Sequence, residues 1–168
     1  AYSFAALLAE GLGQLSYAVR QNVDPLLGRA FAEHRVQEIG PEVGRIRKFV
    51  VPGMLMAAVL LSAAFPWLAA LSHLVDGRTE AWQALGILLA GVVAASAYRP
   101  FAGHLLQGGR PGWNSGLTAC VVAVNFVLCF ALVPGLGALG AALATMGAAL
   151  VESLLICATA RLFWRLPL

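Results

Sequence analysis

The chain has 168 residues, of which 60% are hydrophobic and only 11% charged, and its formal net charge is +3. Soluble domains carry about 25% charged residues, so this composition excludes an ordinary water-soluble globular protein. The mean hydropathy of +0.81 favours a polytopic membrane protein of the all-α class, because backbone groups in lipid must be hydrogen-bonded within their own segment. The basic residues form no stripe with interleaved aromatic residues, so nothing indicates nucleic acid as a partner.

Five apolar stretches have about the length of a bilayer-spanning helix, ~20 residues. In chain order, the predicted helices cover residues 2–19, 49–73, 82–106, 113–133 and 136–163. The third has an alternative end at Tyr98, because Pro100 follows. Residues 25–48 form the one long polar connection, in which apolar residues recur at helical spacing and Gly40-Pro41 should cause a break. We interpret it as a cytoplasmic amphipathic element, with a solvated helical linker as the alternative.

The basic residues are distributed unevenly between the two sides that five alternating crossings would create. One side holds Arg20, Arg29, Arg35, Arg45, Arg47, Lys48, Arg99, Arg110, Arg161 and Arg165, and the other holds Arg78. The positive-inside bias identifies the arginine-rich side as cytoplasmic, so the N-terminus is expected outside and the C-terminus inside. Because the chain opens at Ala1 within an apolar segment, we expect it to be part of a longer protein.

A tight hairpin is predicted between the fourth and fifth helices. Pro134 ends one helix and Gly137 begins the next, which is typical of a short turn. Gly140 and Ala144 follow at a spacing of four, and small residues at this spacing let another helix pack closely. Asn125, one helix earlier, is interpreted as a residue that hydrogen-bonds across a helix interface.

This hairpin resembles the N-x-x-L-x-x-x-L-x-P-x-x-G-x-x-G-A-A-x-A-T pattern of lipid-linked oligosaccharide flippases and polysaccharide-export proteins. These proteins belong to the multidrug, oligosaccharidyl-lipid and polysaccharide exporter superfamily. The matching positions are Asn125, Leu128, Leu132, Pro134, Gly137, Gly140, Ala141, Ala142, Ala144 and Thr145. The resemblance implies a fold of two six-helix halves around a central cavity, in which this chain forms most of the C-terminal half.

The resemblance also implies a function, namely the flipping of a polyprenyl-pyrophosphate-linked saccharide for cell-surface polysaccharide or cell-wall synthesis in the bacterial cytoplasmic (inner) membrane. The implied partners are the lipid-linked saccharide, membrane lipids and the remaining N-terminal half of the same protein, with a coupling proton or sodium ion as a further candidate. The chain is not expected to be an enzyme, and no catalytic residue, metal site or cofactor is expected.

Two other functions stay open from the residues. A drug or cation antiporter of the same superfamily would share the architecture and depend more on intramembrane acids, of which Glu10 and Glu152 are present. A membrane enzyme that acts on lipid-linked substrates is the less favoured alternative. Such an enzyme usually needs paired or metal-binding carboxylates, whereas Asp24 and Asp76 are isolated and fall on opposite sides.

Four polar residues within apolar stretches are candidates for lining a substrate cavity. A charge at mid-membrane costs about 2.5 to 3.5 kcal/mol on insertion scales, so an ionisable group there needs a reason. Glu10, Gln14 and Tyr17 share one helical face because they are spaced by four and three; the alternative for Glu10 is a position near the outer interface. Glu152 either titrates or binds a cation, or it hydrogen-bonds a neighbouring helix.

Arg99 is the candidate for binding the pyrophosphate of the lipid carrier. If the third helix continues past Pro100, Arg99 lies about 13 Å from Gly108 at 1.5 Å per residue. It would then face the cytoplasmic half of a cavity, where the planar donor fork of a guanidinium matches phosphate oxygens. The alternative is that Pro100 ends the helix and that Arg99 snorkels to the membrane surface.

Overall fold

The chain folds as a bundle of long helices. The computed structural model describes residues 2–35, 39–71 and 78–164. Of these described residues 93% are helical, and no strand occurs among them. The elements are α1 (Tyr2–Ala32), α2 (Ile39–Leu71), α3 (Arg78–Ser96), the 3-10 helix η2 (Arg99–Phe101), α4 (His104–Gln107) and α5 (Pro111–Trp164). The all-α class expected from the composition is therefore present.

Within the described ranges, three helices are long and apolar enough to cross a membrane: α2 over Ile39–Ala70, α3 over Thr79–Ser96 and α5. α1 is not one of the three. Large apolar side chains are exposed on the outside of the bundle, among them Phe49 at 76% and Phe130 at 79%. Water would disfavour such surfaces, whereas lipid tails accept them, so the helices fit a membrane protein.

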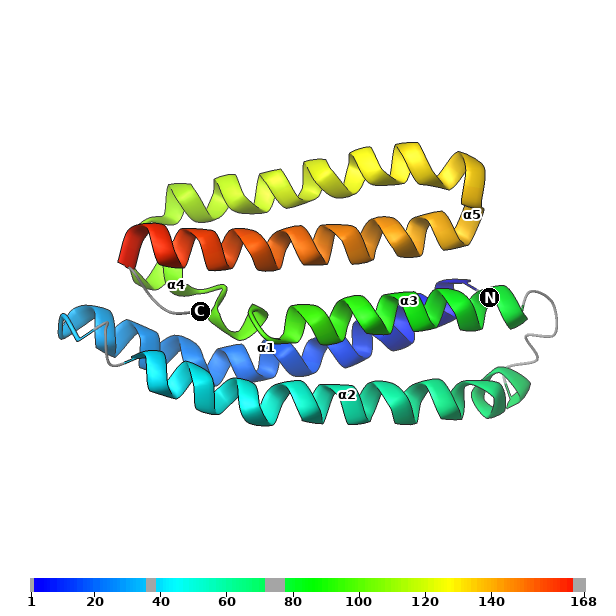
Figure 1. Cartoon of the computed structure of the whole chain (residues 1–168), viewed down its shortest axis with the longest axis horizontal. Coiled ribbons are helices and arrows are strands. Elements are labelled where there is room, and N and C mark those ends of the chain that lie inside the picture. Colours follow the sequence, from blue (N-terminus) through cyan, green and yellow to red (C-terminus); the bar gives the residue numbers. More distant parts are fainter. Residues whose placement is uncertain (1, 36–38, 72–77, 165–168) are drawn as a thin grey trace.

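Helix α5 is a hairpin of two antiparallel arms, seen as the upper layer of Figure 1. The reversal occurs at Gly137, whose φ of 57° and ψ of −128° are not helical. A positive φ is open to glycine at little cost and strained for other residues. A Cβ at Gly140 would lie 2.6 Å from the carbonyl carbon of Leu132, so only glycine lets the two arms approach this closely.

Helix α3 lies at the centre of the bundle and packs against α1, α2 and α5. In Figure 1 the α5 hairpin covers one side of α3, while α1 and α2 cover the other. A buried core joins these helices through Phe65 of α2, Ala9 of α1, and Leu85 and Leu88 of α3. A second core fills the other end of the bundle, where Val23, Leu27, Val43, Phe101 and Ile156 are buried. The two cores fix α1 along its length against the rest of the fold.

The expected connection over residues 25–48 is not a separate element, and the expected end of the first helix at residue 19 is wrong. α1 continues through Pro25 to Ala32. The apolar contacts of Val23 and Leu27 outweigh the cost of a proline inside a helix, about 3 kcal/mol.

The expected start of the second helix at residue 49 is also wrong, because α2 begins at Ile39. Pro41 falls in its first turn, where backbone N–H groups lack helical partners in any case. Pro52 and Pro66 lie inside α2 without ending it. Residues 36–38, residues 72–73 at the expected end of this helix, and Arg165 lie outside the described residues.

A continuous third helix over residues 82–106 is wrong as well. α3 starts at Arg78 and ends at Ser96, and η2 and α4 follow as short separate turns. Pro100 explains the break, because it offers no backbone N–H and disfavours the α conformation of the residue before it, Arg99.

The expected hairpin between the fourth and fifth helices is present in α5, with different bounds. Its first arm begins at Pro111 rather than at residue 113, its second arm ends at Trp164 rather than at residue 163, and the chain reverses at Gly137. Pro134 lies inside the helix. The turn is thus made by the glycine with positive φ, three residues after the proline.

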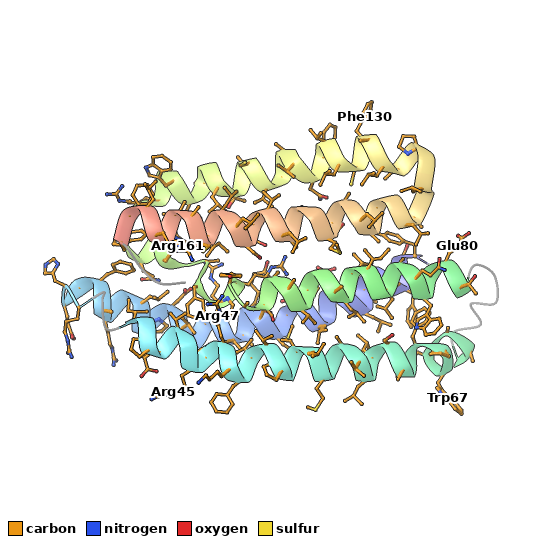
Figure 2. The ribbon with its side chains drawn as sticks, in the orientation of Figure 1. Arg45, Arg47, Trp67, Glu80, Phe130 and Arg161 are labelled. Atoms are coloured by element: carbon orange, nitrogen blue, oxygen red, sulfur yellow. The ribbon has the colours of Figure 1, made fainter. Side chains whose placement is uncertain are left out.

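Several arginine side chains lie toward one end of the bundle. Figure 2 shows Arg45, Arg47 and Arg161 near one end, whereas Glu80 and Trp67 lie at the other. The guanidinium of Arg47 stacks on Tyr98, 4.4 Å from the ring centroid, a contact that holds the start of α2 near the end of α3.

Candidate functional site

A cleft of about 510 Å³ lies between α1 and the second arm of α5, with α3 as its floor. The floor is apolar and consists of Leu88, Gly91 and Val92. Polar groups come from the other elements. They are Tyr2, Glu10, Gln14 and Tyr17 of α1, Arg99 of η2 and Thr145 of α5.

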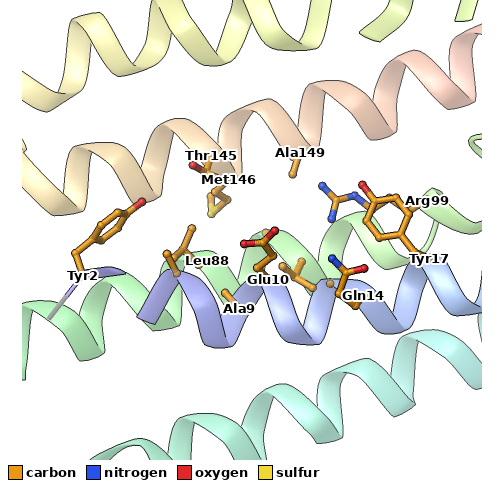
Figure 3. Close-up of a pocket in the computed structure, with 14 residues that line it drawn as sticks. Tyr2, Ala9, Glu10, Gln14, Tyr17, Leu88, Arg99, Thr145, Met146 and Ala149 are labelled. Carbon is orange, nitrogen blue, oxygen red and sulfur yellow. The ribbon is translucent and has the colours of Figure 1, made fainter. Parts of the chain in front are cut away.

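The polar side chains of α1 project from one face of that helix toward α5, as Figure 3 shows. Glu10, Gln14 and Tyr17 are all exposed, Tyr17 at 46%. The neighbouring positions Ala9 and Gly13 are buried and line the cleft wall. Glu10 has no hydrogen-bond or ion-pair partner within the described part of the chain, so its carboxylate is available to a ligand.

Arg99 closes one end of the cleft. Its Nε donates a hydrogen bond to Oε2 of Glu152, at 3.1 Å, and the two side chains are 22% and 23% exposed. A Cβ at Gly13 would lie 3.8 Å from Nη1 of Arg99, so the guanidinium extends over α1 where that helix has no side chain. The 3-10 turn after α3, rather than a continuing helix, places Arg99 here.

The structure thus brings together most of the residues that the sequence singled out. Glu10, Gln14, Tyr17 and Arg99 line one cleft, and Glu152 joins it through its ion pair with Arg99. These side chains come from segments that are far apart in the sequence. Their proximity depends on the packing of α1 and α5 on the two sides of α3.

The residues of the hairpin motif mostly lie away from this cleft. Asn125 is partly buried and accepts a hydrogen bond from Cys129 Sγ at 3.7 Å, within the first arm. Pro134 and Gly137 are exposed at the bend, whereas Gly140 and Ala144 are buried. Thr145 is the exception, because it lines the cleft while its hydroxyl donates to the carbonyl of Ala141 at 3.0 Å.

Some residues of the site were not predicted. Tyr2 lies eight residues before Glu10, a spacing of just over two helical turns, and the face pattern of α1 would have found it. Met146 lines the cleft and gives no such signal. Gly91 carries no signal either: a Cβ there would lie 3.1 Å from the Cα of Met146, so this glycine sets the close approach of α3 and α5.

A buried histidine fixes the chain just after η2. Nδ1 of His104 donates to the carbonyl oxygen of Phe101 at 2.9 Å, and Nε2 lies 2.9 Å from the hydroxyl of Thr159 in α5. Its ring packs edge-on against Trp164. Burial lowers the pKa of His104 below its ordinary value, and the positive charge of Arg20 adds to this effect. The neutral ring therefore ties the turn that carries Arg99 to the end of α5.

The charges at the cleft sum to about −1, with Glu10 and Glu152 negative and Arg99 positive. No group of three or more histidine, cysteine, aspartate or glutamate side chains that could hold a metal ion occurs among the described residues. The site offers hydroxyl and amide groups for hydrogen bonding, one guanidinium and one unpaired carboxylate.

Comparison of the chain with protein-family models, with curated proteins and with solved structures found no match. The resemblance to lipid-linked oligosaccharide flippases therefore stays a prediction that rests on the hairpin residues.

Proposed function

We propose that the chain is part of a flippase that moves a polyprenyl-pyrophosphate-linked saccharide across a membrane. The observation that carries the proposal is the cleft, which gathers Glu10, Gln14, Tyr17 and Arg99 inside a bundle of apolar helices. A polar headgroup cannot enter hydrocarbon without hydrogen-bonding partners, and these side chains would supply them. The hairpin pattern around Pro134 and Gly140 supports the same substrate class.

The size of the cleft suits a headgroup rather than a single ion. Its volume of about 510 Å³ falls in the range of small-molecule sites, roughly 300–1,000 Å³. Tyr2 and Tyr17 mark its two ends along α1, and 15 residues of helix span about 22 Å. A pyrophosphate with one or two sugars has such an elongated shape, and Arg99 would hold the phosphate end.

Helix lengths and the distribution of charge support the proposed arrangement in the membrane. Each arm of α5 extends about 39 Å at 1.5 Å per residue, more than the ~30 Å hydrocarbon core. If α1 also crosses, α1, α2, α3 and the two arms of α5 would give the five expected crossings. The end that carries Arg45, Arg47 and Arg161 would then be cytoplasmic in a bacterial inner membrane. The remaining N-terminal half of the same protein would form the opposite wall for alternating access.

A drug or cation antiporter is the second candidate, and the charge of the cleft favours it. Glu10 is exposed and without a partner in the described ranges, and Glu152 is a second acid, paired with Arg99 at one end of the cleft. Two carboxylates against one guanidinium would attract a cation rather than an anion. The antiporter shares the helices and the cleft with the flippase and differs in substrate charge.

Transport by the complete transporter in proteoliposomes separates the two functions. We expect a fluorescent polyprenyl-pyrophosphate disaccharide to become accessible in the opposite leaflet, as measured by reduction of the fluorophore from outside. Cationic dyes should not be moved in the same vesicles. Dye efflux driven by a proton or sodium gradient, without movement of the lipid-linked sugar, would favour the antiporter.

A further inference from the structure

The ion pair between Arg99 and Glu152 occupies the position where an anionic ligand would bind. It joins η2 to the second arm of α5 at one end of the cleft. With 22% and 23% of the two side chains exposed, the pair is protected enough for its charges to attract strongly, yet a ligand can reach it. Another anion therefore has room to replace the Glu152 carboxylate at the Arg99 guanidinium.

The guanidinium has donors to spare. Of its five N–H groups, only the one on Nε is hydrogen-bonded within the described part of the chain. Nη1 extends over Gly13, where no side chain competes for it. A phosphate oxygen pair matches this fork better than a single carboxylate oxygen does.

The charges oppose anion binding as long as both acids are ionised. A diphosphate that enters the cleft meets Glu10 and Glu152 as well as Arg99, and like charges at close range repel strongly when they are partly desolvated. The charge that must be removed first is that of Glu152, because this carboxylate touches the guanidinium. Neutralising it changes the sum of charges at the cleft from about −1 to 0.

We propose that Glu152 is an exchangeable counter-ion, which takes up a proton from solution when a diphosphate group binds to Arg99 and thereby couples proton uptake to ligand binding. The carboxylate becomes a carboxylic acid, Arg99 keeps its charge, and no covalent bond forms or breaks. The inference rests on the proposed function for its ligand class, a diphosphate.

Other groups at the cleft do not take this role. Glu10 lines it without contact to Arg99, and Tyr2 and Tyr17 of α1 are phenols. The lining of α3 is apolar, and Thr145, Met146 and Ala149 of α5 are uncharged. His104, which follows η2, is buried in its bonds to Phe101 and Thr159.

Binding of inorganic pyrophosphate to the purified protein tests the inference, by calorimetry between pH 5 and pH 8 in buffers of different ionisation enthalpy. As the pH rises, the affinity of the wild-type protein for pyrophosphate should fall, by up to about tenfold more per pH unit than the affinity of Glu152→Gln. At pH 7.5, Glu152→Gln should bind pyrophosphate at least tenfold more tightly than the wild-type protein. It should also take up about one proton fewer for each pyrophosphate bound. Glu10→Gln is the matched control. It removes the other acid of the cleft, and it should take up the same number of protons on pyrophosphate binding as the wild-type protein.

Two further measurements test the inference without depending on whether Glu152→Gln folds. Infrared difference spectra of wild-type protein with labelled glutamate should gain a carboxylic-acid band when pyrophosphate is added, whether or not Glu152→Gln folds. Farnesyl diphosphate should show the same proton uptake, and tighter binding than pyrophosphate would identify a lipid carrier as the ligand source, whereas equal binding would identify a free diphosphate.

The inference is overturned if Glu152→Gln binds no tighter than wild type at pH 7.5, if both take up the same number of protons, or if no carboxylic-acid band appears. Absence of pyrophosphate binding at every pH also overturns it. Flipping of the lipid-linked sugar is measured separately, so the proposed function stands or falls on its own result.

Discussion

Arg99 reaches the cleft because Pro100 interrupts the third helix. The sequence offered two alternatives, a buried arginine on a continuous helix or a surface arginine after a broken one. The structure combines parts of both, since α3 ends at Ser96 and Arg99 is nevertheless only 22% exposed. The partner Glu152 is 53 residues away, a contact that only the packed fold creates.

Gly137 provides the cleanest test of the hairpin at the scale of one residue. No atom lies within 4 Å of a Cβ built there, so the cost of Gly137→Ala arises from the positive φ of 57° alone. We expect a loss of about 1–3 kcal/mol in the free energy of unfolding in detergent micelles, because φ 57° with ψ −128° is a backbone conformation that residues other than glycine rarely adopt. Gly135→Ala is the control, because that site has open space and no positive φ. Equal stability of the two variants would contradict the assigned turn.

His104 should make stability depend on pH. Because burial lowers its pKa below the ordinary 6.5, the folded state favours the neutral ring; this stabilisation is complete above about pH 6.5 and is lost as the pH falls through the lowered pKa. His104→Gln should therefore cost about 1–2 kcal/mol at pH 7.5, and less at pH 5, in thermal unfolding. The exposed His34 serves as control in His34→Gln. A difference that is constant between the two pH values would refute this role.

At the scale of elements, the contact between α3 and α5 depends on Gly91. A Cβ there would lie 3.0–3.2 Å from three atoms of Met146, including its Cα. We expect Gly91→Ala to push the helices apart and to reduce the free energy of unfolding by about 1–3 kcal/mol. Gly86 on the same helix has open space, so Gly86→Ala should stabilise by up to about 1 kcal/mol. Similar effects of the two variants would exclude a tight contact at Gly91.

The sequence predicted elements well where local chemistry decides them. Composition alone indicates apolar helices, and the spacing of Glu10, Gln14 and Tyr17 places them on one face. The helix ends were predicted less well. Pro25 lies inside α1, whose tertiary contacts outweigh the local cost, and Pro41 falls in the first turn of α2, where a proline is tolerated. The floor of the cleft was not predicted, because the need for glycine at position 91 arises only from the close packing of Met146 against it in the folded chain.

At the scale of the whole molecule, the cleft exists because α1 and α5 pack on α3 and leave a space between themselves. That space collects polar groups of α1, η2 and α5 within a bundle whose outside is apolar. A path for a polar headgroup through lipid requires this arrangement. The proposed role of the cleft, and of Arg99 within it, is therefore to bind the headgroup during flipping.

Flipping of a fluorescent polyprenyl-pyrophosphate saccharide by Arg99 variants of the complete transporter tests this claim most directly. At equal amounts in the membrane, we predict that Arg99→Lys keeps part of the wild-type rate and that Arg99→Gln loses it at least tenfold, because a charge must meet the pyrophosphate. Arg110→Gln is the charge-matched control, since Arg110 stacks on Phe163 away from the cleft, and its rate should stay within about twofold of wild type. A wild-type rate for Arg99→Gln would contradict the account.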